Sequence, residues 1–192
     1  MNTSDTSQPK WRCRHLRIAA LLPLFAAALF FTPYRTYAAS KEYQVKAVFI
    51  YNFAQFVRWP SSAFSDAGAP LTIGVLGDDP FGGALETATQ GESIRGRQLA
   101  IKRSRTVGGL KGCQIIFISK SENSRLGEIF GALKGQGILT VGESAGFCAQ
   151  GGMLNFTIQD GNVHVEIHLD AVKREGLGIS SNLIKSCTIF RP

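Results

Sequence analysis

The sequence contains no C-x-x-C pair, no cluster of cysteine with histidine, and only three histidines in 192 residues. Structural zinc sites draw their ligands from such clusters, so we expect neither a metal nor another cofactor. The sequence also lacks a long hydrophobic run, since the apolar stretch Ile18–Phe31 has 14 residues and contains Pro23. A membrane-spanning helix needs about 20 apolar residues, so this stretch is too short for a transmembrane anchor.

Residues 1–38 have the organisation of a secretory signal peptide. Four basic residues precede the apolar stretch: Lys10, Arg12, Arg14 and Arg17. After it, Thr36-Tyr37-Ala38 places small residues at the two positions that define a cleavage site. The sequence therefore predicts export to the periplasm with cleavage near Ala38, which leaves residues 39–192 as one domain with no direct membrane insertion.

Strong charge of one sign is also missing from the predicted mature chain. Five of the 21 Lys and Arg residues and one of the 14 acidic residues lie in residues 1–38, so residues 39–192 carry a net charge of +3. This near balance gives little support to nucleic-acid binding. The locally basic segment Arg95–Arg105 is interpreted as a solvated strand with flanking loops rather than a phosphate-binding patch.

Three cysteines remain beyond the predicted cleavage site: Cys113, Cys148 and Cys187. An odd number in an oxidising compartment leaves at least one free thiol or an intermolecular disulfide. An intramolecular bridge would be 113–148, 113–187 or 148–187, and the sequence does not select among them. Cys113 begins an apolar strand and is expected to be buried, whereas Cys148, in a glycine-flanked loop, is expected to be the most accessible thiol.

The sequence from residue 42 onward predicts an α/β fold. Apolar residues recur at helical spacing over residues 42–59, and Pro60 ends this first helix. Short apolar runs that predict strands then alternate with predicted helices, a pattern typical of a mostly parallel sheet. The strands are expected at Leu71–Leu76, Gln98–Lys102, Cys113–Ser119 and Ile138–Val141, and the helices between Pro80 and Ala88 and at Glu122–Lys134.

The pattern changes after residue 152. Met153–Gln159 and Asn162–Leu169 alternate apolar and polar residues around Asp160-Gly161, which predicts a β-hairpin. A helix is expected at Asp170–Glu175, and a last one at Asn182–Ile189, capped by Ser180 or Ser181. The sequence thus predicts a single three-layer Rossmann-like α/β domain with a mostly parallel sheet and a C-terminal β-hairpin plus helix.

The segment Gly142–Gly146 reads GESAG and matches G-x-S-x-G, which carries the nucleophilic serine of α/β-hydrolases. Ser144 would be the nucleophile, and an acid (Asp160 or Asp170) and a histidine (His164 or His168) follow in the required order. The segment after Ser144 reaches Gly151-Gly152 within seven residues, however, which leaves little room for the supporting helix. The match is interpreted as accidental, with a small secreted serine esterase as the alternative function.

The histidines give the esterase little further support. His164, Glu166 and His168 alternate with apolar residues on one predicted strand, so a shared solvated face is the simplest explanation for them. The 48 residues after Ser144 are also few for a hydrolase sheet.

The turn Gly77–Gly83 (GDDPFGG) lies between a predicted strand and a predicted helix, where α/β sheets often bind anions. It lacks the Walker lysine, and the carboxylates of Asp78 and Asp79 would repel a phosphate. We therefore interpret the acidic pair as a cap of the following helix, with a periplasmic small-ligand sensor as a further alternative.

Five segments together resemble the YfiR-type, or HmsC-type, family of periplasmic proteins. They are KAVFIYNFAQFVRWP (46–60), IGVLGDDPFGGAL (73–85), GCQIIFIS (112–119), ILTVGESAGFCAQGGMLNF (138–156) and NVHVEIHLDAVKREGLGISSNLIK (162–185). The resemblance implies a non-enzymatic regulator that binds the periplasmic sensory domain of an inner-membrane diguanylate cyclase and represses it. This would lower cyclic di-GMP and restrain biofilm and exopolysaccharide formation. It also implies homodimers, redox sensitivity, and a structural loop at GESAG.

One departure bears on redox control. Some family members carry a cysteine near the position of Gly74 that can bridge to the position of Cys113, and here that partner is missing. Disulfide control is therefore not transferred from the family, although Cys113, Cys148 and Cys187 remain the candidate redox residues.

The first predicted helix is the candidate partner interface. Tyr51, Phe53, Phe56 and Trp59 supply more aromatic area than one buried stripe requires, and aromatic residues commonly anchor interfaces. The alternative is that all four pack on the protein's own sheet.

Overall fold

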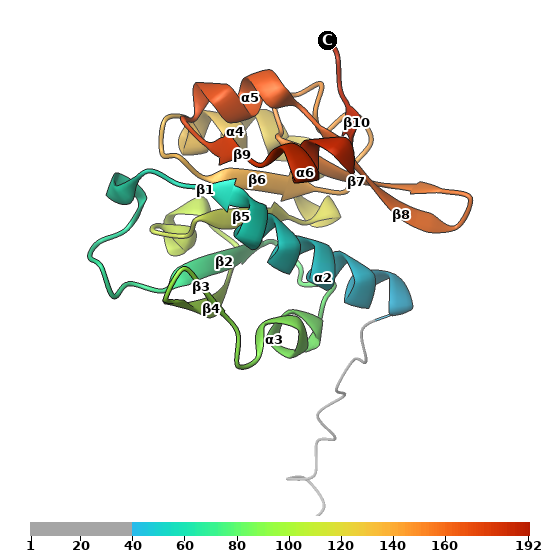
Figure 1. The fold of residues 1–192 in the computed structure, drawn as a ribbon. Helices are drawn as coiled ribbons and strands as arrows, with labels where there is room; N and C mark the ends of the chain where they lie inside the picture. The colour runs from blue at the N-terminus through green and yellow to red at the C-terminus, as the bar shows by residue number, and fades with distance from the viewer. Residues whose placement is uncertain (1–39) are drawn as a thin grey trace, which may run out of the picture. The chain divides into compact units, whose positions relative to one another are not determined.

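A computed structural model of the chain describes residues 40–192 (Figure 1). Its main feature is an eight-stranded sheet with the order β10-β8-β7-β6-β5-β2-β4-β3. Five neighbouring strands run parallel: β4 (Arg97–Ser104), β2 (Leu71–Leu76), β5 (Ile115–Ile118), β6 (Leu139–Gly142) and β7 (Leu154–Gln159). Strands buried on both faces are expected to be apolar throughout, and all four residues of β5 are buried. The predicted α/β fold with a mostly parallel sheet is confirmed.

The predicted hairpin is also present. β7 pairs antiparallel with β8 (Asn162–Ile167), and Asp160 and Gly161 between them have φ angles of 49° and 75°. Two positive φ angles in succession are what a tight hairpin turn requires, and an Asp-Gly pair tolerates them well. Two short strands complete the sheet edges: β10 (Thr188–Ile189) lies parallel to β8, and β3 (Ser93–Ile94) lies antiparallel to β4.

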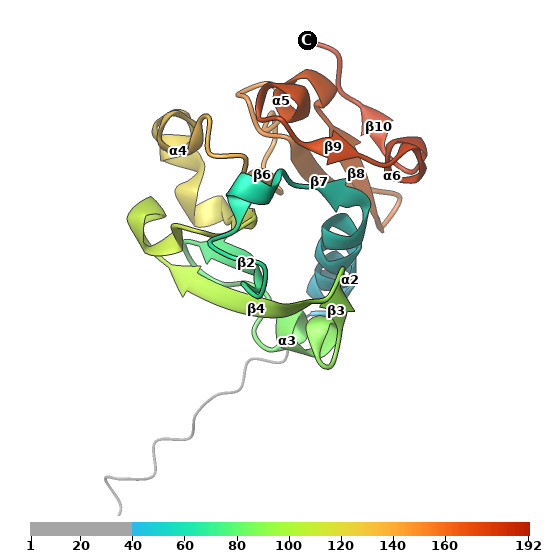
Figure 2. The ribbon, with the colours of Figure 1, turned by 60° about the vertical axis from the view of Figure 1, so that its left-hand side comes forward.

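Helices cover both faces of the sheet, which confirms the three-layer arrangement (Figure 2). One core contains buried residues of the helix α2 (Lys41–Phe56), of α3 (Ala84–Thr89), of α5 (Leu169–Arg174) and of α6 (Ser181–Lys185). A second core lies beneath α4 (Leu126–Leu133) and the short 3-10 helix Val107–Leu110. No helix within residues 40–192 is long and apolar enough to cross a membrane, and the predicted signal peptide lies outside the described residues.

Most helices are shorter than the sequence pattern predicts. The helix α2 ends at Phe56 because the next two residues form β1 (Val57–Arg58), which pairs antiparallel with β9 (Gly178–Ile179). Residues Lys120–Arg125 form a 3-10 helix before α4, and a second one spans Ser61–Ala63. The predicted cap of α6 is confirmed, since the Ser180 hydroxyl accepts a hydrogen bond from the Asn182 amide at 3.2 Å.

The acidic pair at the end of β2 does not cap α3, so that interpretation is wrong. The helix α3 has Gly83 at its N-cap, with no side-chain hydrogen bond. Asp79 instead accepts from the Phe81 amide at 2.8 Å and pairs with Arg103 at 2.7 Å. Asp78 pairs with Arg105 at 2.8 Å. The carboxylates therefore bind arginines of the neighbouring β4 and the loop after it.

These ion pairs also account for the basic segment Arg95–Arg105. Arg103 pairs with Glu86 at 2.6 Å as well as with Asp79. The Arg97 guanidinium donates to the carbonyls of Asp66 and Ala69 and lies 3.8 Å from the centre of the Phe64 ring. Arg97 and Arg103 of β4 thus bind the segments before β2 and around the start of α3.

Candidate functional site

The GESAG loop connects β6 to β7, and the aromatic ring of Phe147 determines its shape. Phe147 is fully buried and packs edge-on against Phe130 with 5.3 Å between ring centres. A Cβ atom at Gly142 would lie 2.3 Å from this ring, and one at Gly152 would lie 2.1 Å from it. Only glycine lets the backbone pass so close on both sides. The first glycine of GESAG is therefore required by packing, without any nucleophile.

Ser144 is 5% exposed, and its hydroxyl donates to the Asn123 side-chain oxygen. An amide oxygen is too weak a base to activate a serine. His168 is held elsewhere, with Nδ1 3.0 Å from the Cys148 carbonyl oxygen. Within residues 40–192, no hydrogen bond joins Ser144 to a histidine, and no group of three or more His, Cys, Asp or Glu side chains could hold a metal.

Replacing Ser144 with alanine is expected to leave any trace ester hydrolysis by the purified mature protein unchanged. The variant loses one hydrogen bond to Asn123, which costs about 1 kcal/mol of stability. Hydrolysis of p-nitrophenyl acetate and labelling by a fluorophosphonate measure the effect on activity. A loss of turnover of about a hundredfold or more would restore the esterase alternative.

The glutamate of GESAG belongs to a buried charged cluster. Lys46 is 1% exposed, and its ammonium group lies 2.5 Å from a Glu143 carboxylate oxygen and in contact with the Glu42 carboxylate. The Tyr43 hydroxyl donates to the other Glu143 oxygen at 3.0 Å. Burial, and next the negative charge of Glu143, raise the pKa of the Tyr43 hydroxyl, so it stays a donor at neutral pH. The cluster joins the first turns of α2 to the loop that follows the central strand β6.

This cluster was not predicted from the sequence, although a signal was present. Lys46 occupies the inward stripe of α2 together with Ile50, Phe53 and Ala54. A lysine at a core position of an amphipathic helix needs a buried partner. Glu42, at i,i+4, was visible as one partner, whereas Glu143 lies 97 residues away in sequence and becomes a neighbour only through the fold.

The four aromatic residues proposed as a partner interface occupy different environments. Phe53 is fully buried and stacks on Phe156 with 5.8 Å between ring centres, so it is unavailable to a partner. Tyr51, Phe56 and Trp59 are half-buried. The Tyr51 hydroxyl donates to Glu92 at 2.8 Å, and Trp59 Nε1 donates to the Gln114 carbonyl at 3.1 Å.

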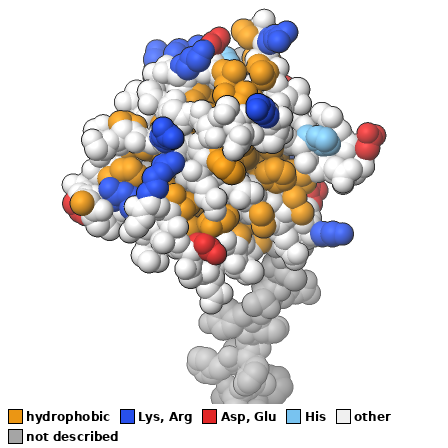
Figure 3. Space-filling view, viewed as in Figure 1, with side chains coloured by type: hydrophobic (Ala, Val, Ile, Leu, Met, Phe, Trp, Pro, Cys, Tyr) orange, Lys and Arg blue, Asp and Glu red, His pale blue; other side chains and the backbone are white. Residues whose placement is uncertain are grey.

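The outward face of α2 carries two valines instead. Val45 is 39% exposed and Val48 is 50% exposed, and Phe49 beside them is half-buried. Phe49 contacts Phe156 of β7 with 6.1 Å between ring centres, and Ile158, two residues further along the same face of β7, is 51% exposed and pairs with Val163. We call this surface the α2–hairpin patch: Val45, Val48, Phe49, Ile158 and Val163. Figure 3 shows apolar side chains gathered over α2 and beside the hairpin.

Exposed apolar side chains that gather on one face of a domain can mark an interaction surface. Val45 and Val48 lie on the solvent side because Lys46, between them in sequence, turns inward to Glu143. The helix is apolar on most sides, so its sequence alone does not reveal which side faces the sheet.

The structure corrects two expectations about the thiols and histidines. Cys148 is fully buried rather than accessible, and its sulfur lies 3.9 Å from the carbonyl oxygens of Met153 and Glu166. His168 is 7% exposed rather than solvated, because it follows β8 at the start of α5 and binds the Cys148 carbonyl. Cys113 is 2% exposed, as expected, although it lies two residues before β5 rather than at its start.

The three cysteines within residues 40–192 are free thiols. Burial raises the pKa of the Cys113, Cys148 and Cys187 thiols, so they stay protonated and weakly nucleophilic at neutral pH. A Cβ atom at Gly74 would lie 3.1 Å from the Cys113 sulfur. A cysteine at position 74, as the resemblance describes for some relatives, would therefore face Cys113 directly, and this chain has none.

A comparison with protein-family models identifies the domain. The model described as YfiR/HmsC-like matches residues 43–186. This chain belongs to the YfiR/HmsC-like family. The match runs from the first turn of α2 to the end of α6, so the GESAG loop, the α2–hairpin patch and all of the buried cluster except Glu42 lie within the family domain. Membership of the YfiR/HmsC-like family supports a periplasmic regulatory role in diguanylate cyclase signalling in general.

Two further comparisons add little. No curated protein matches the chain. Among solved structures, a conserved domain protein from Vibrio cholerae O1 biovar El Tor str. N16961 is similar over 63% of this chain and 55% of that chain, so the match spans about half of that protein. The identity is 10% and the TM-score is 0.46, which is too low to support an argument about function.

Proposed function

We propose that this YfiR/HmsC-like protein is a non-enzymatic periplasmic regulator that binds the periplasmic sensory domain of an inner-membrane diguanylate cyclase and keeps the cyclase inactive. Cyclic di-GMP would fall as a result, and with it biofilm and exopolysaccharide output. The observation that carries the proposal is an exposed apolar patch inside the family domain. A repressor must bind the inactive state of its target better than the active state, and apolar side chains on a rigid helix suit such selective contact.

The rigidity of the patch supports this role. The helix α2 is anchored at its N-terminal turns by the ion pairs of Lys46 and along its length by the stacking of Phe53 on Phe156. Binding of a partner through Val45 and Val48 therefore costs the helix little conformational entropy.

Neither alternative function has comparable support. Ser144 lacks a base, as described above. At the Gly77 turn, a Cβ atom would lie 2.4 Å from the Ser121 hydroxyl oxygen and 2.7 Å from a Glu122 carboxylate oxygen. The Asp78 amide, which could otherwise bind an anion, already donates to Ser121 at 3.0 Å. The protein's own side chains thus fill the space that a ligand of the small-ligand sensor would need.

Placing a charge in the patch is expected to relieve repression without unfolding the domain. Val48→Glu and, independently, Ile158→Glu should raise cellular cyclic di-GMP to the level of a strain that lacks the protein, because a buried unpaired carboxylate opposes complex formation. Both positions are about half exposed, so the melting temperature of each purified variant should stay within about 3 °C of the wild type, as expected for surface substitutions.

Ile189→Glu is the matched control. Ile189 is 42% exposed on β10, outside the patch, and the control should repress like the wild type. If both patch variants repress normally, or if loss of repression occurs only in variants that unfold, the interface lies elsewhere. Tyr51, Phe56 and Trp59 are then the next positions to test.

Two further expectations are separate from this test. Association of two copies of the protein through the patch would show as a change in the sedimentation coefficient. Redox control through Cys113, Cys148 or Cys187 stays a prediction.

A further inference from the structure

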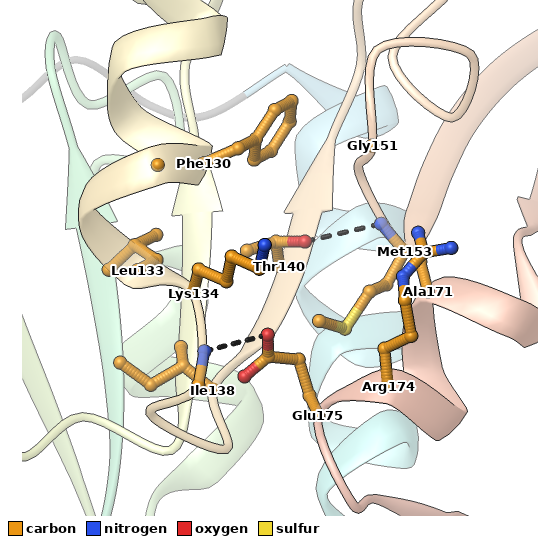
Figure 4. Close-up of a pocket in the computed structure, with 12 residues that line it drawn as sticks. Phe130, Leu133, Lys134, Ile138, Thr140, Gly151, Met153, Ala171, Arg174 and Glu175 are labelled. Carbon is orange, nitrogen blue, oxygen red and sulfur yellow. Dashed lines mark hydrogen bonds between the residues drawn. The ribbon is translucent and has the colours of Figure 1, made fainter.

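A groove with a volume of about 500 Å³ lies between α4 and α5 (Figure 4). Small-molecule sites in proteins commonly occupy about 300–1,000 Å³. Phe130, Leu133 and Ile138 form one wall, and Met153 and Ala171 form the other. The groove shares no residue with the α2–hairpin patch, with the buried Lys46 cluster or with Ser144.

Two of the three charged side chains that line the groove are cations. Lys134, just after α4, and Arg174, at the end of α5, lie on opposite sides of the opening (Figure 4). Both are exposed, and neither forms an ion pair or side-chain hydrogen bond within residues 40–192. Glu175 lies between them, but its carboxylate accepts hydrogen bonds from the amides of Gly135 at 2.9 Å and Gly137 at 3.1 Å. Its negative charge is therefore partly satisfied by the backbone, whereas the two cations are unpaired.

The floor of the groove adds one polar group. The Thr140 hydroxyl oxygen accepts a hydrogen bond from the Met153 amide at 3.2 Å, so its own hydrogen can point towards a bound molecule. Around it the lining is apolar. An apolar groove with a few polar groups at its opening and floor favours a ligand that has a polar head and an apolar body.

We propose that the α4–α5 groove binds a small monocarboxylate with an apolar body. The carboxylate is held by Arg174, which can form two parallel hydrogen bonds, and by Lys134. The apolar body lies against Phe130, Leu133 and Met153. This site does not depend on the proposed regulatory function, and because the two surfaces are separate, such a ligand and a protein partner can bind at the same time.

Isothermal titration of the purified mature protein with sodium octanoate and with the neutral isostere octanamide tests the site. We expect octanoate to bind with a Kd below about 1 mM, and octanamide at least about tenfold more weakly, since it lacks the charge. The double variant Lys134→Gln/Arg174→Gln should abolish this preference, and both substitutions are at exposed positions that tolerate change.

A second variant tests the location. Gly131 is exposed on α4 and lines the groove, and a Cβ atom there meets no atom within 4 Å. Gly131→Leu should fill the groove while improving helix propensity, so the fold is retained and octanoate affinity falls at least about tenfold. The proposal is overturned if the wild type does not bind octanoate, if octanoate and octanamide bind equally, or if Gly131→Leu binds as well as the wild type.

Discussion

Replacing Lys46 with methionine is expected to lower the free energy of unfolding by about 3–5 kcal/mol, because Glu143 would remain buried without its cation. The Glu143 side chain is 1% exposed, and its remaining partner is the Tyr43 hydroxyl at 3.0 Å. Methionine has a similar length and fills the same space, so the cost comes from the unpaired charge rather than from a cavity. Urea unfolding at neutral pH, followed by circular dichroism, measures it.

Two further variants separate the charge from other effects. Glu42 contacts the same ammonium group but is 41% exposed, so Glu42→Gln should cost less than about 1 kcal/mol. The double variant Lys46→Met/Glu143→Met removes both buried charges and should recover most of the stability, as is found when a buried ion pair is replaced by apolar residues. If Lys46→Met is no less stable than Glu42→Gln, the buried pair does not anchor α2.

Gly152→Ala is expected to destabilise the domain by about 3 kcal/mol through overpacking. The new Cβ atom would lie 2.1 Å from the ring of Phe147, which is fully buried and confined from its other side by Gly142. Neither the ring nor the backbone can move away easily in a close-packed core. Thermal or denaturant unfolding of the purified variant measures the effect.

A double-mutant cycle identifies the cause. Phe147→Leu removes the part of the ring that would clash, so the double variant should be more stable than the sum of the single effects by at least about 1 kcal/mol. Gly146→Ala is the control, since Gly146 has a φ angle of 70° but nothing within 4 Å of its Cβ position. It should cost about 1 kcal/mol from backbone strain alone and show no coupling to Phe147→Leu. Additive effects for Gly152→Ala would contradict the steric explanation.

The sheet was predictable because its strands carry local signals. Buried parallel strands such as Leu71–Leu76 are short apolar runs, and Asp160-Gly161 specifies a tight turn between two alternating strands. The helix ends were less predictable. The helix α2 stops at Phe56 because Val57 and Arg58 pair with β9, which is distant in sequence.

The loops and the outward face of α2 required the tertiary structure. A glycine-flanked cysteine suggests an exposed loop, yet Cys148 is buried. The ring of the preceding residue, Phe147, packs between Gly142 and Gly152 and holds the loop against the core. The acidic pair after β2 had a local explanation as a helix cap, and long-range arginines on the β4 side proved to be its partners. On α2, Val45 and Val48 matched the apolar spacing of core residues, and only the ion pair of Lys46 fixes which side turns inward.

Direct binding of the purified mature protein to the purified periplasmic domain of each membrane-bound diguanylate cyclase of its host tests the proposed function most sharply. Surface plasmon resonance should detect one such domain that binds the wild type with a Kd of about 10 µM or tighter, in the range usual for regulatory interfaces. Val48→Glu should weaken this binding at least about tenfold, and Ile189→Glu should leave it unchanged. If the folded wild type binds none of these domains, or if Val48→Glu and Ile158→Glu bind as tightly as the wild type, regulation through the α2–hairpin patch is contradicted.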